Sequence, residues 1–194
     1  PLTAVGDVNT YALFAEGNRN LISCRGKAGF IIPPNLATDD TMKGFFGDLI
    51  SSKSFASLYG FMNSRKIFAD IKDYMKFALV TFGTAEECNF MFMLTRVEQL
   101  RDEQRKFSLS QTDLTLLNPN TRTCAVFRTQ ADATLTKLLY KRTPVLWNEA
   151  STNTWGIKFQ RLFDMANDSA LFLNAPDPKS LPLYEAKFIW HYDH

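Results

Sequence analysis

Histidine, cysteine and long apolar runs are scarce in this sequence, and each shortage removes a class of protein. The 194 residues contain two histidines and three cysteines. The cysteines lie far apart, at Cys24, Cys88 and Cys124, and form no CxxC pair, which argues against a disulfide framework and a zinc site. The apolar runs, such as 77–82 and 90–94, are far shorter than the roughly 20 residues of a membrane-spanning helix. We therefore expect a soluble, cytoplasmic protein without a metal centre.

An initiator methionine and a signal peptide are also absent. The sequence opens at Pro1 and stops at His194, directly after the aromatic segment 183–194. We interpret both ends as cut and expect a fragment of a longer protein. A motif that is missing from this chain can therefore lie elsewhere in the parent.

Strong charge of either sign is lacking over the chain as a whole. The composition is 45% hydrophobic and 22% charged, which is enough to bury a core and excludes the disordered and low-complexity classes. The net charge of +2 does not mark the whole chain as a nucleic-acid binder. Residues 101–142, however, carry eight basic and four acidic side chains, a local charge of +4 that leaves −2 for the remainder. This basic middle fits phosphate contacts, and it equally fits a solvated surface.

Hydrophobic patterning in the first part of the chain predicts alternating helices and strands. Periodic apolar positions predict helices over 9–23 and 38–52. Short runs rich in β-forming residues predict strands over 27–33, 55–61 and 74–82. The helix between the first two strands favours a neighbouring parallel pair with a buried first strand, and the helix-free connection that follows favours an antiparallel hairpin. The fold class is therefore α/β with a mixed sheet.

Shorter elements are expected from residue 86 onward. They comprise a strand over 89–95, a charged helix over 97–104, helices over 112–117 and 131–142, and an extended segment over 155–163. The last two helices follow capping signatures, in which Ser110 is paired with Asp113 and Thr129 with Asp132.

Six stretches of the sequence, taken in order, resemble one family of enzymes. The first three are GKAGFIIPPNLATDDTMKGFFGDL, SLYGFMNSRKIF and YMKFALVTFG. They resemble the second half of the methyltransferase domain in type IIG restriction-modification proteins and related phage-defence methyltransferases, which act on adenine in DNA. Further on come SLSQTDLTLLNPNTRTCAVFRTQADATLTKLLYKRTPVL, WGIKFQRLFDMANDS and LPLYEAKFIWHYDH. These are similar to the linker and early target-recognition segments of the same proteins.

The resemblance implies a fold and a division of the chain. Residues 1–85 would supply the last three strands, including an antiparallel hairpin, of a seven-stranded Rossmann-like methyltransferase sheet. Residues 86–194 would form a smaller α+β region, comprising the linker and the start of the target-recognition region.

The resemblance also implies S-adenosylmethionine as the cofactor of the parent protein, with Mg needed only if a nuclease is fused to it. In such proteins the Gly-rich loop that holds this cofactor and the Asn/Asp-Pro-Pro-aromatic loop that grips adenine both precede the part that this chain matches. The sequence 118–120 (NPN) is no substitute for the second loop, because it lacks the second proline and the aromatic residue.

Two sets of residues are candidates for the target-base pocket. An enzyme that modifies adenine within a duplex must swing the base out and hold it against apolar surfaces. In the resembling family an aromatic residue ahead of the hairpin's last strand lies against the extruded base, and Phe68 matches that position. Pro33, Pro34 and Asn35 follow the first strand, where open α/β sheets place their ligands. The alternatives are that Phe68 is a core residue and that Asn35 only forms a turn.

Basic residues in two regions are candidates for DNA backbone contacts. Lysines around Phe68 and cations in the basic middle have the reach and charge to meet phosphates, although exposed solubilising residues have the same properties. These candidates are Lys66, Lys72, Lys76, Arg122, Arg128, Lys141 and Arg142.

The sequence therefore predicts a fragment of a site-specific DNA adenine-N6 methyltransferase that contributes the base pocket and contacts to double-stranded DNA. Alone it should be inactive. The alternative is a non-enzymatic DNA-recognition or assembly module. An exposed edge at 27–33 predicts a dimer of the isolated chain. Near the end of the chain, Glu185, His191, Asp193 and His194 suggest a metal site, but we expect these residues to serve protein packing.

Overall fold

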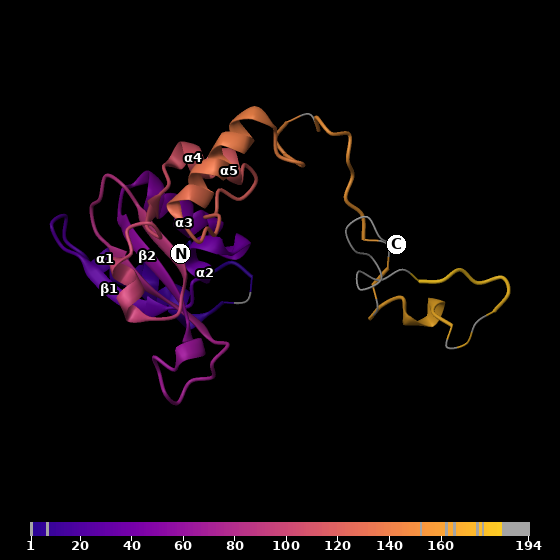
Figure 1. Cartoon of the computed structure of the whole chain (residues 1–194), viewed down its shortest axis with the longest axis horizontal. Coiled ribbons are helices and arrows are strands. Elements are labelled where there is room, and N and C mark those ends of the chain that lie inside the picture. The colour runs from indigo at the N-terminus through magenta and orange to yellow at the C-terminus, as the bar shows by residue number, and fades with distance from the viewer. Residues whose placement is uncertain are drawn as a thin grey trace. The chain divides into compact units, whose positions relative to one another are not determined.

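The computed structural model describes residues 2–6, 8–151, 153–161, 163–164, 166–173, 175 and 177–183. The chain divides into two units, Pro1–Gly156 and Ile157–His194. The first unit contains the whole β-sheet (Figure 1). In the described part of the second unit the one regular element is a short 3-10 helix, η4 (Ser169–Leu171). The described residues of the predicted extended segment 155–163 form no strand.

A five-stranded mixed sheet is the frame of the first unit, with the strand order β1-β3-β2-β4-β5. The strands are β1 (Ala28–Ile32), β2 (Phe55–Met62), β3 (Lys76–Phe82), β4 (Asn89–Leu94) and β5 (Phe107–Ser108). β3 is antiparallel to both β1 and β2, β2 is parallel to β4, and β4 is antiparallel to β5. Consequently β1, β2 and β4 run in the same direction, and their carboxyl ends meet at one edge of the sheet.

The α/β class, the strands and the antiparallel hairpin of β2 and β3 are confirmed, but the expected pairing of the first two strands is wrong. β1 and β2 do run in the same direction, yet β3 lies between them and pairs with both. The expectation of a buried first strand is also wrong, because Ile31 is 53% exposed. The sheet continues past residue 85 into β4 and β5. The assignment of different functions to residues 1–85 and 86–194 remains a prediction.

Local side-chain bonds set the helix boundaries. The helix α1 (Thr10–Leu21) begins at Asn9, whose side chain accepts from the Tyr11 N–H. The single helix expected over 38–52 is instead divided into α2 (Asn35–Thr38), the 3-10 turn η1 (Asp40–Met42) and α3 (Lys43–Ser51). The division occurs at Asp39, which has extended backbone angles and caps η1 by accepting from the Thr41 N–H.

The elements after β2 are η2 (Asn63–Arg65), η3 (Val97–Arg101), α4 (Gln111–Leu117) and α5 (Gln130–Arg142). Both predicted capping boxes are confirmed at the starts of α4 and α5. The charged helix expected over 97–104 is wrong in type and length: it is a five-residue 3-10 turn that ends at Arg101 and is followed by the capping residue Asp102. The Asp102 carboxylate accepts from the Gln104 N–H and so supports the turn that follows. In Figure 1, α4 and α5 lie side by side.

An aromatic core fills the space between the helices and one face of the sheet. Phe46, Phe55, Phe82 and Phe90 are all fully buried. The Phe55 ring is central, because its centroid lies 5.5 Å from that of Phe46, 5.8 Å from that of Phe90 and 5.9 Å from that of Phe82. Such aromatic contacts add to the burial of apolar area that stabilises the fold.

The other face of the sheet carries a smaller apolar cluster. Along β3, Ala78 and Val80 face the main core, so Phe77 and Leu79 project from the opposite side. Phe61 is buried there, and its ring stacks on that of Phe77 with centroids 5.2 Å apart and planes 5° apart. This stack lies next to the connection 63–75 between β2 and β3.

Replacing the central ring of the core should cost much of the stability. Phe55→Ala removes a fully buried side chain, and such changes cost about 3–5 kcal/mol of unfolding free energy. Urea denaturation of the chain measures this loss. Leu135→Ala on α5 is the control, because Leu135 is 58% exposed and the change should cost less than about 0.5 kcal/mol. Equal losses for the two variants would contradict this description of the core.

The outer edge of β1 should drive self-association. In the part of the chain that the structure describes, β1 pairs only with β3, and its five residues include no charge or proline that would oppose further pairing. We propose that the isolated chain dimerises through this edge. Ile31→Lys should therefore shift the sedimentation profile towards monomer, whereas Leu135→Lys on α5 should not. A monomeric unmodified chain at high concentration would refute the proposal.

Candidate functional site

A pocket lies at the edge of the sheet where β1, β2 and β4 end. Ligands of open α/β sheets bind outside the carboxyl ends of the strands. The pocket has a volume of about 440 Å³ and is called the strand-tip pocket below. Its lining comes from the turn after β1, the ends of β2 and β4, the first residue of β3, and the segment before α5. These residues are Pro34, Asn35, Thr38, Gly60, Phe61, Met62, Lys76, Phe92, Met93, Thr95, Val126 and Arg128.

Apolar groups form the walls of the strand-tip pocket. Phe61, Met62, Phe92 and Val126 contribute aromatic or aliphatic surface. Gly60 keeps β2 close to the neighbouring strand, because a Cβ at this position would lie only 3.1 Å from a ring carbon of Phe92. The pocket can therefore accept a flat apolar group against the end of the sheet.

The segment after β1 contributes two polar residues, Asn35 and Thr38, to the lining of the pocket. The Asn35 Nδ2 lies 3.5 Å from an oxygen of Asp39, which is a weak hydrogen bond. Hydrogen bonds from the backbone N–H and hydroxyl of Thr41 hold the pKa of the Asp39 carboxyl below its usual range. Asn35 is exposed, and among the described residues no protein group donates to its Oδ1. This oxygen is available to a ligand.

A second hollow adjoins the strand-tip pocket and shares Thr95 with it. It has a volume of about 620 Å³ and is lined by Arg65, Thr95, Arg96, Glu98, Gln99 and Asp102. The two hollows together are called the strand-tip groove below. Asp102 is already paired with Arg105, at 3.3 Å.

Four exposed cations line the strand-tip groove: Arg65, Lys76, Arg96 and Arg128. None of them forms an ion pair with another residue in the described ranges. Their charge is therefore free to meet an anion along the groove. Sequence analysis missed Arg65 and Arg96. Arg65 lies within the quoted run SLYGFMNSRKIF and Arg96 follows β4, so a search for basic residues just after strands would have found both.

The structure gathers only part of the predicted site at this edge. Pro34, Asn35, Lys76 and Arg128 line the strand-tip pocket together, although Arg128 is far from the others in sequence. Pro33 precedes the pocket and is not in its lining. Arg122, Lys141 and Arg142 line neither hollow. Lys141 and Arg142 lie in the final turn of α5, where their positive charges interact favourably with the negative end of the helix dipole.

Phe68, Lys66 and Lys72 lie in the connection 63–75, which extends from the sheet as a purple ribbon in Figure 1. Phe68 is 39% exposed, and its ring meets that of Phe77 edge to face with centroids 4.9 Å apart. The Lys66 Nζ donates to the Ile71 carbonyl at 3.1 Å. The Lys72 Nζ lies 5.7 Å from the ring centroid of Tyr74. Phe68 is thus neither a fully buried core residue nor part of the pocket lining.

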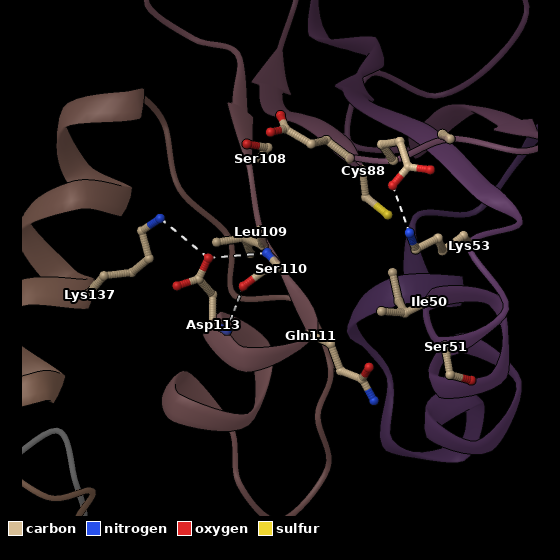
Figure 2. A pocket seen from close by; sticks show the side chains of 13 residues that line it. Ile50, Ser51, Lys53, Cys88, Ser108, Leu109, Ser110, Gln111, Asp113 and Lys137 are labelled. Carbon is tan, nitrogen blue, oxygen red and sulfur yellow. Dashed lines mark hydrogen bonds and ion pairs between the residues drawn. The ribbon is translucent and has the colours of Figure 1, made fainter.

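A further pocket, of about 320 Å³, lies at the opposite edge of the sheet (Figure 2). Its cations are paired within the protein: Lys53 with Glu86 at 2.6 Å, and Lys137 with Asp113 at 3.4 Å. The buried Cys88 Sγ donates to a backbone carbonyl, and burial raises the pKa of this thiol to about 11. A protonated thiol is a poor nucleophile, so this pocket offers neither an unpaired cation among its lining residues nor a reactive thiol.

Metal-ligand groupings and membrane spans are both missing from the described residues. No group of three or more His, Cys, Asp or Glu side chains in those ranges is placed to hold a metal ion. Glu185, His191, Asp193 and His194 lie outside the described residues. Within the same ranges no helix has the length and apolar character needed to cross a membrane.

Comparisons with known proteins supply no identity for the chain. No family model matches it, and no curated protein is significantly similar to it.

Proposed function

We propose that this chain is part of a site-specific DNA adenine-N6 methyltransferase of the restriction-modification or phage-defence kind. Its role there is to build the target-base pocket and to contact double-stranded DNA. The observation that carries the proposal is an apolar pocket at the strand ends with Lys76 and Arg128 in its lining. An extruded base needs apolar walls, and the phosphates beside it need cations.

The elements of the sheet support the proposal. The resembling runs coincide with structural units: the first spans β1 to α3, the second β2 and η2, and the third β3. Together they form a three-strand unit in which both pairings are antiparallel, and it contains the hairpin of β2 and β3 that the resemblance implies for residues 1–85. The parallel pairing that makes the sheet mixed lies outside this unit, between β2 and β4. The Rossmann-like identity of the complete sheet belongs to the same proposal.

Each group at the groove has a proposed role. The Phe68 ring, which lies on the connection 63–75 and outside the pocket lining, stacks on the extruded adenine. The Asn35 Oδ1 accepts a hydrogen bond from the base. Lys76 and Arg128 hold phosphates next to the pocket, and Arg65 and Arg96 extend these contacts along the groove. Arg122, Lys141 and Arg142 serve phosphate contacts elsewhere on the DNA.

S-adenosylmethionine would supply the methyl group in the parent protein. The residues of this chain do not fit it, because the turn that follows β1 is Pro33-Pro34 and no Gly-rich phosphate or cofactor loop follows any strand of the described residues. We propose that the parent holds the cofactor with other residues, and holds Mg only if it carries a nuclease. The chain itself then shapes the base pocket and carries out no methyl transfer alone.

A non-enzymatic DNA-recognition or assembly module is the second candidate. The second hollow favours it, because two arginines along a groove bind a DNA backbone without any chemistry. The polypeptide as encoded, with any residues that precede Pro1, distinguishes the two. Methylation of adenine by that polypeptide selects the enzyme. Salt-dependent duplex binding without methylation selects the module.

The chain alone should not bind S-adenosylmethionine. Isothermal titration should give no saturable heat at micromolar cofactor, because no cofactor loop is present. Tight binding would contradict the proposed division of roles between this chain and its parent.

Duplex DNA should bind to the strand-tip groove through phosphate contacts. Lys76→Ala and Arg128→Ala should each lower the slope of log affinity against log salt concentration by about 1, since each removes one phosphate contact. Fluorescence anisotropy with a labelled duplex measures the slopes. Lys137→Ala is the matched control, because Lys137 is paired with Asp113 at the opposite edge. Unchanged slopes in both groove variants would show that the strand-tip groove does not contact the DNA.

The Phe68 ring should contribute directly to methylation by the encoded polypeptide. Phe68→Ala should lower kcat/KM for methyl transfer by about 10- to 100-fold, because stacking on a base is worth about 1–3 kcal/mol. Phe68→Tyr should retain most activity, and thermal unfolding should show that both variants are folded. A folded Phe68→Ala variant with full activity would show that Phe68 has a structural role only.

A further inference from the structure

Asn63 is a buried polar side chain in the connection between β2 and β3. It follows Met62, the last residue of β2, and none of its surface is exposed. Its side chain has two donor hydrogens and one acceptor oxygen, and burying them without partners would be costly. The partners of Asn63 therefore indicate what this residue does.

All of these partners are backbone groups of the same connection. The Asn63 Nδ2 donates to the carbonyls of Phe68 and Ile71, both at 2.9 Å, and lies 3.4 Å from the Lys72 carbonyl. The Asn63 Oδ1 accepts from the Phe68 N–H at 2.9 Å. One side chain thus satisfies backbone groups that would otherwise need water or secondary structure.

Phe68 is the one residue that Asn63 holds from both sides, through its N–H and its carbonyl. The Phe68 ring is fixed separately, because its edge-to-face partner Phe77 is stacked on Phe61. The ring nevertheless remains 39% exposed. Phe68 is therefore a partly exposed aromatic ring with a fixed backbone, and a fixed ring loses little entropy when a base stacks on it.

We infer that Asn63 is a positioning residue that presents the Phe68 ring to an extruded base. The inference rests on the proposed function, which assigns the stacking role to Phe68. No other side chain of similar size meets the same requirements. Aspartate would place a carboxylate against carbonyl oxygens, leucine would leave the backbone groups unpaired, and glutamine would set its amide one methylene too far.

The test uses the full chain and a DNA probe whose base is already unpaired. The probe is a duplex with 2-aminopurine opposite an abasic site, since extrusion is least costly for a base without a partner. The fluorescence of 2-aminopurine is quenched while it stacks on neighbouring bases in DNA, so the signal changes when the base leaves that stack. The variants are Asn63→Ala and Phe68→Ala. Asn118→Ala is the matched control, because Asn118 also ties a loop, through a 2.8 Å bond to the Thr123 carbonyl, but does not line the groove.

The unmodified chain should change the fluorescence of the bound probe, and Phe68→Ala should abolish this change. Asn63→Ala should weaken probe binding by about 10-fold and speed hydrogen exchange at the Phe68 amide by at least about 10-fold, because the loop loses several bonds. Asn118→Ala should change neither quantity. If Asn63→Ala does not fold, Asn63→Gln keeps the amide but displaces it, and the same losses are expected.

Two results overturn the inference in different ways. Faster exchange at Phe68 with unchanged probe binding would make Asn63 a structural residue only, and would leave the proposed function intact. A fluorescence change that is absent, or that persists in Phe68→Ala, would contradict the stacking role of Phe68. That result contradicts the proposed base pocket, and the positioning role of Asn63 fails with it.

Discussion

The pairing of β3 with both β1 and β2 is the interaction on which the rest of the structure depends. β3 fills the space between two strands that run in the same direction, so its backbone groups are satisfied on both sides. The pairing also brings the start of β3 to the carboxyl ends of its neighbours. Lys76 consequently lies in the same pocket as Asn35 and Met62.

The two faces of the sheet have different structural roles. The main face is closed by fully buried aromatic rings around Phe55, which stabilise the unit. The other face carries the stack of Phe61 and Phe77, and the Phe68 ring, from the connection 63–75, packs edge to face against Phe77. A rigid sheet that supports a partly exposed ring is a suitable base for recognising a flat ligand, because the ligand need not order the protein.

The two edges of the sheet differ in whether their cations are paired with acidic residues. At the amino ends of β2 and β4, Lys53 and Lys137 are neutralised by acidic partners. Along the strand-tip groove the cations have no such partners among the described residues. Exposed ion pairs contribute little to stability, so this difference matters mainly for binding. It favours the strand-tip groove as the surface that meets a polyanion.

The sequence by itself determined the positions of the first four strands and the starts of two helices, but not the division of the segment 38–52 or the length of the turn after β4. Apolar runs fixed the strands, and the pairs Ser110 with Asp113 and Thr129 with Asp132 fixed two helix starts, because these signals act over a few residues. Only the tertiary structure decided that β3 lies between β1 and β2, that Arg128 joins Asn35 at one pocket, and that Asn63 holds Phe68. Strand order and such contacts depend on pairing between residues distant in sequence, which no local pattern specifies.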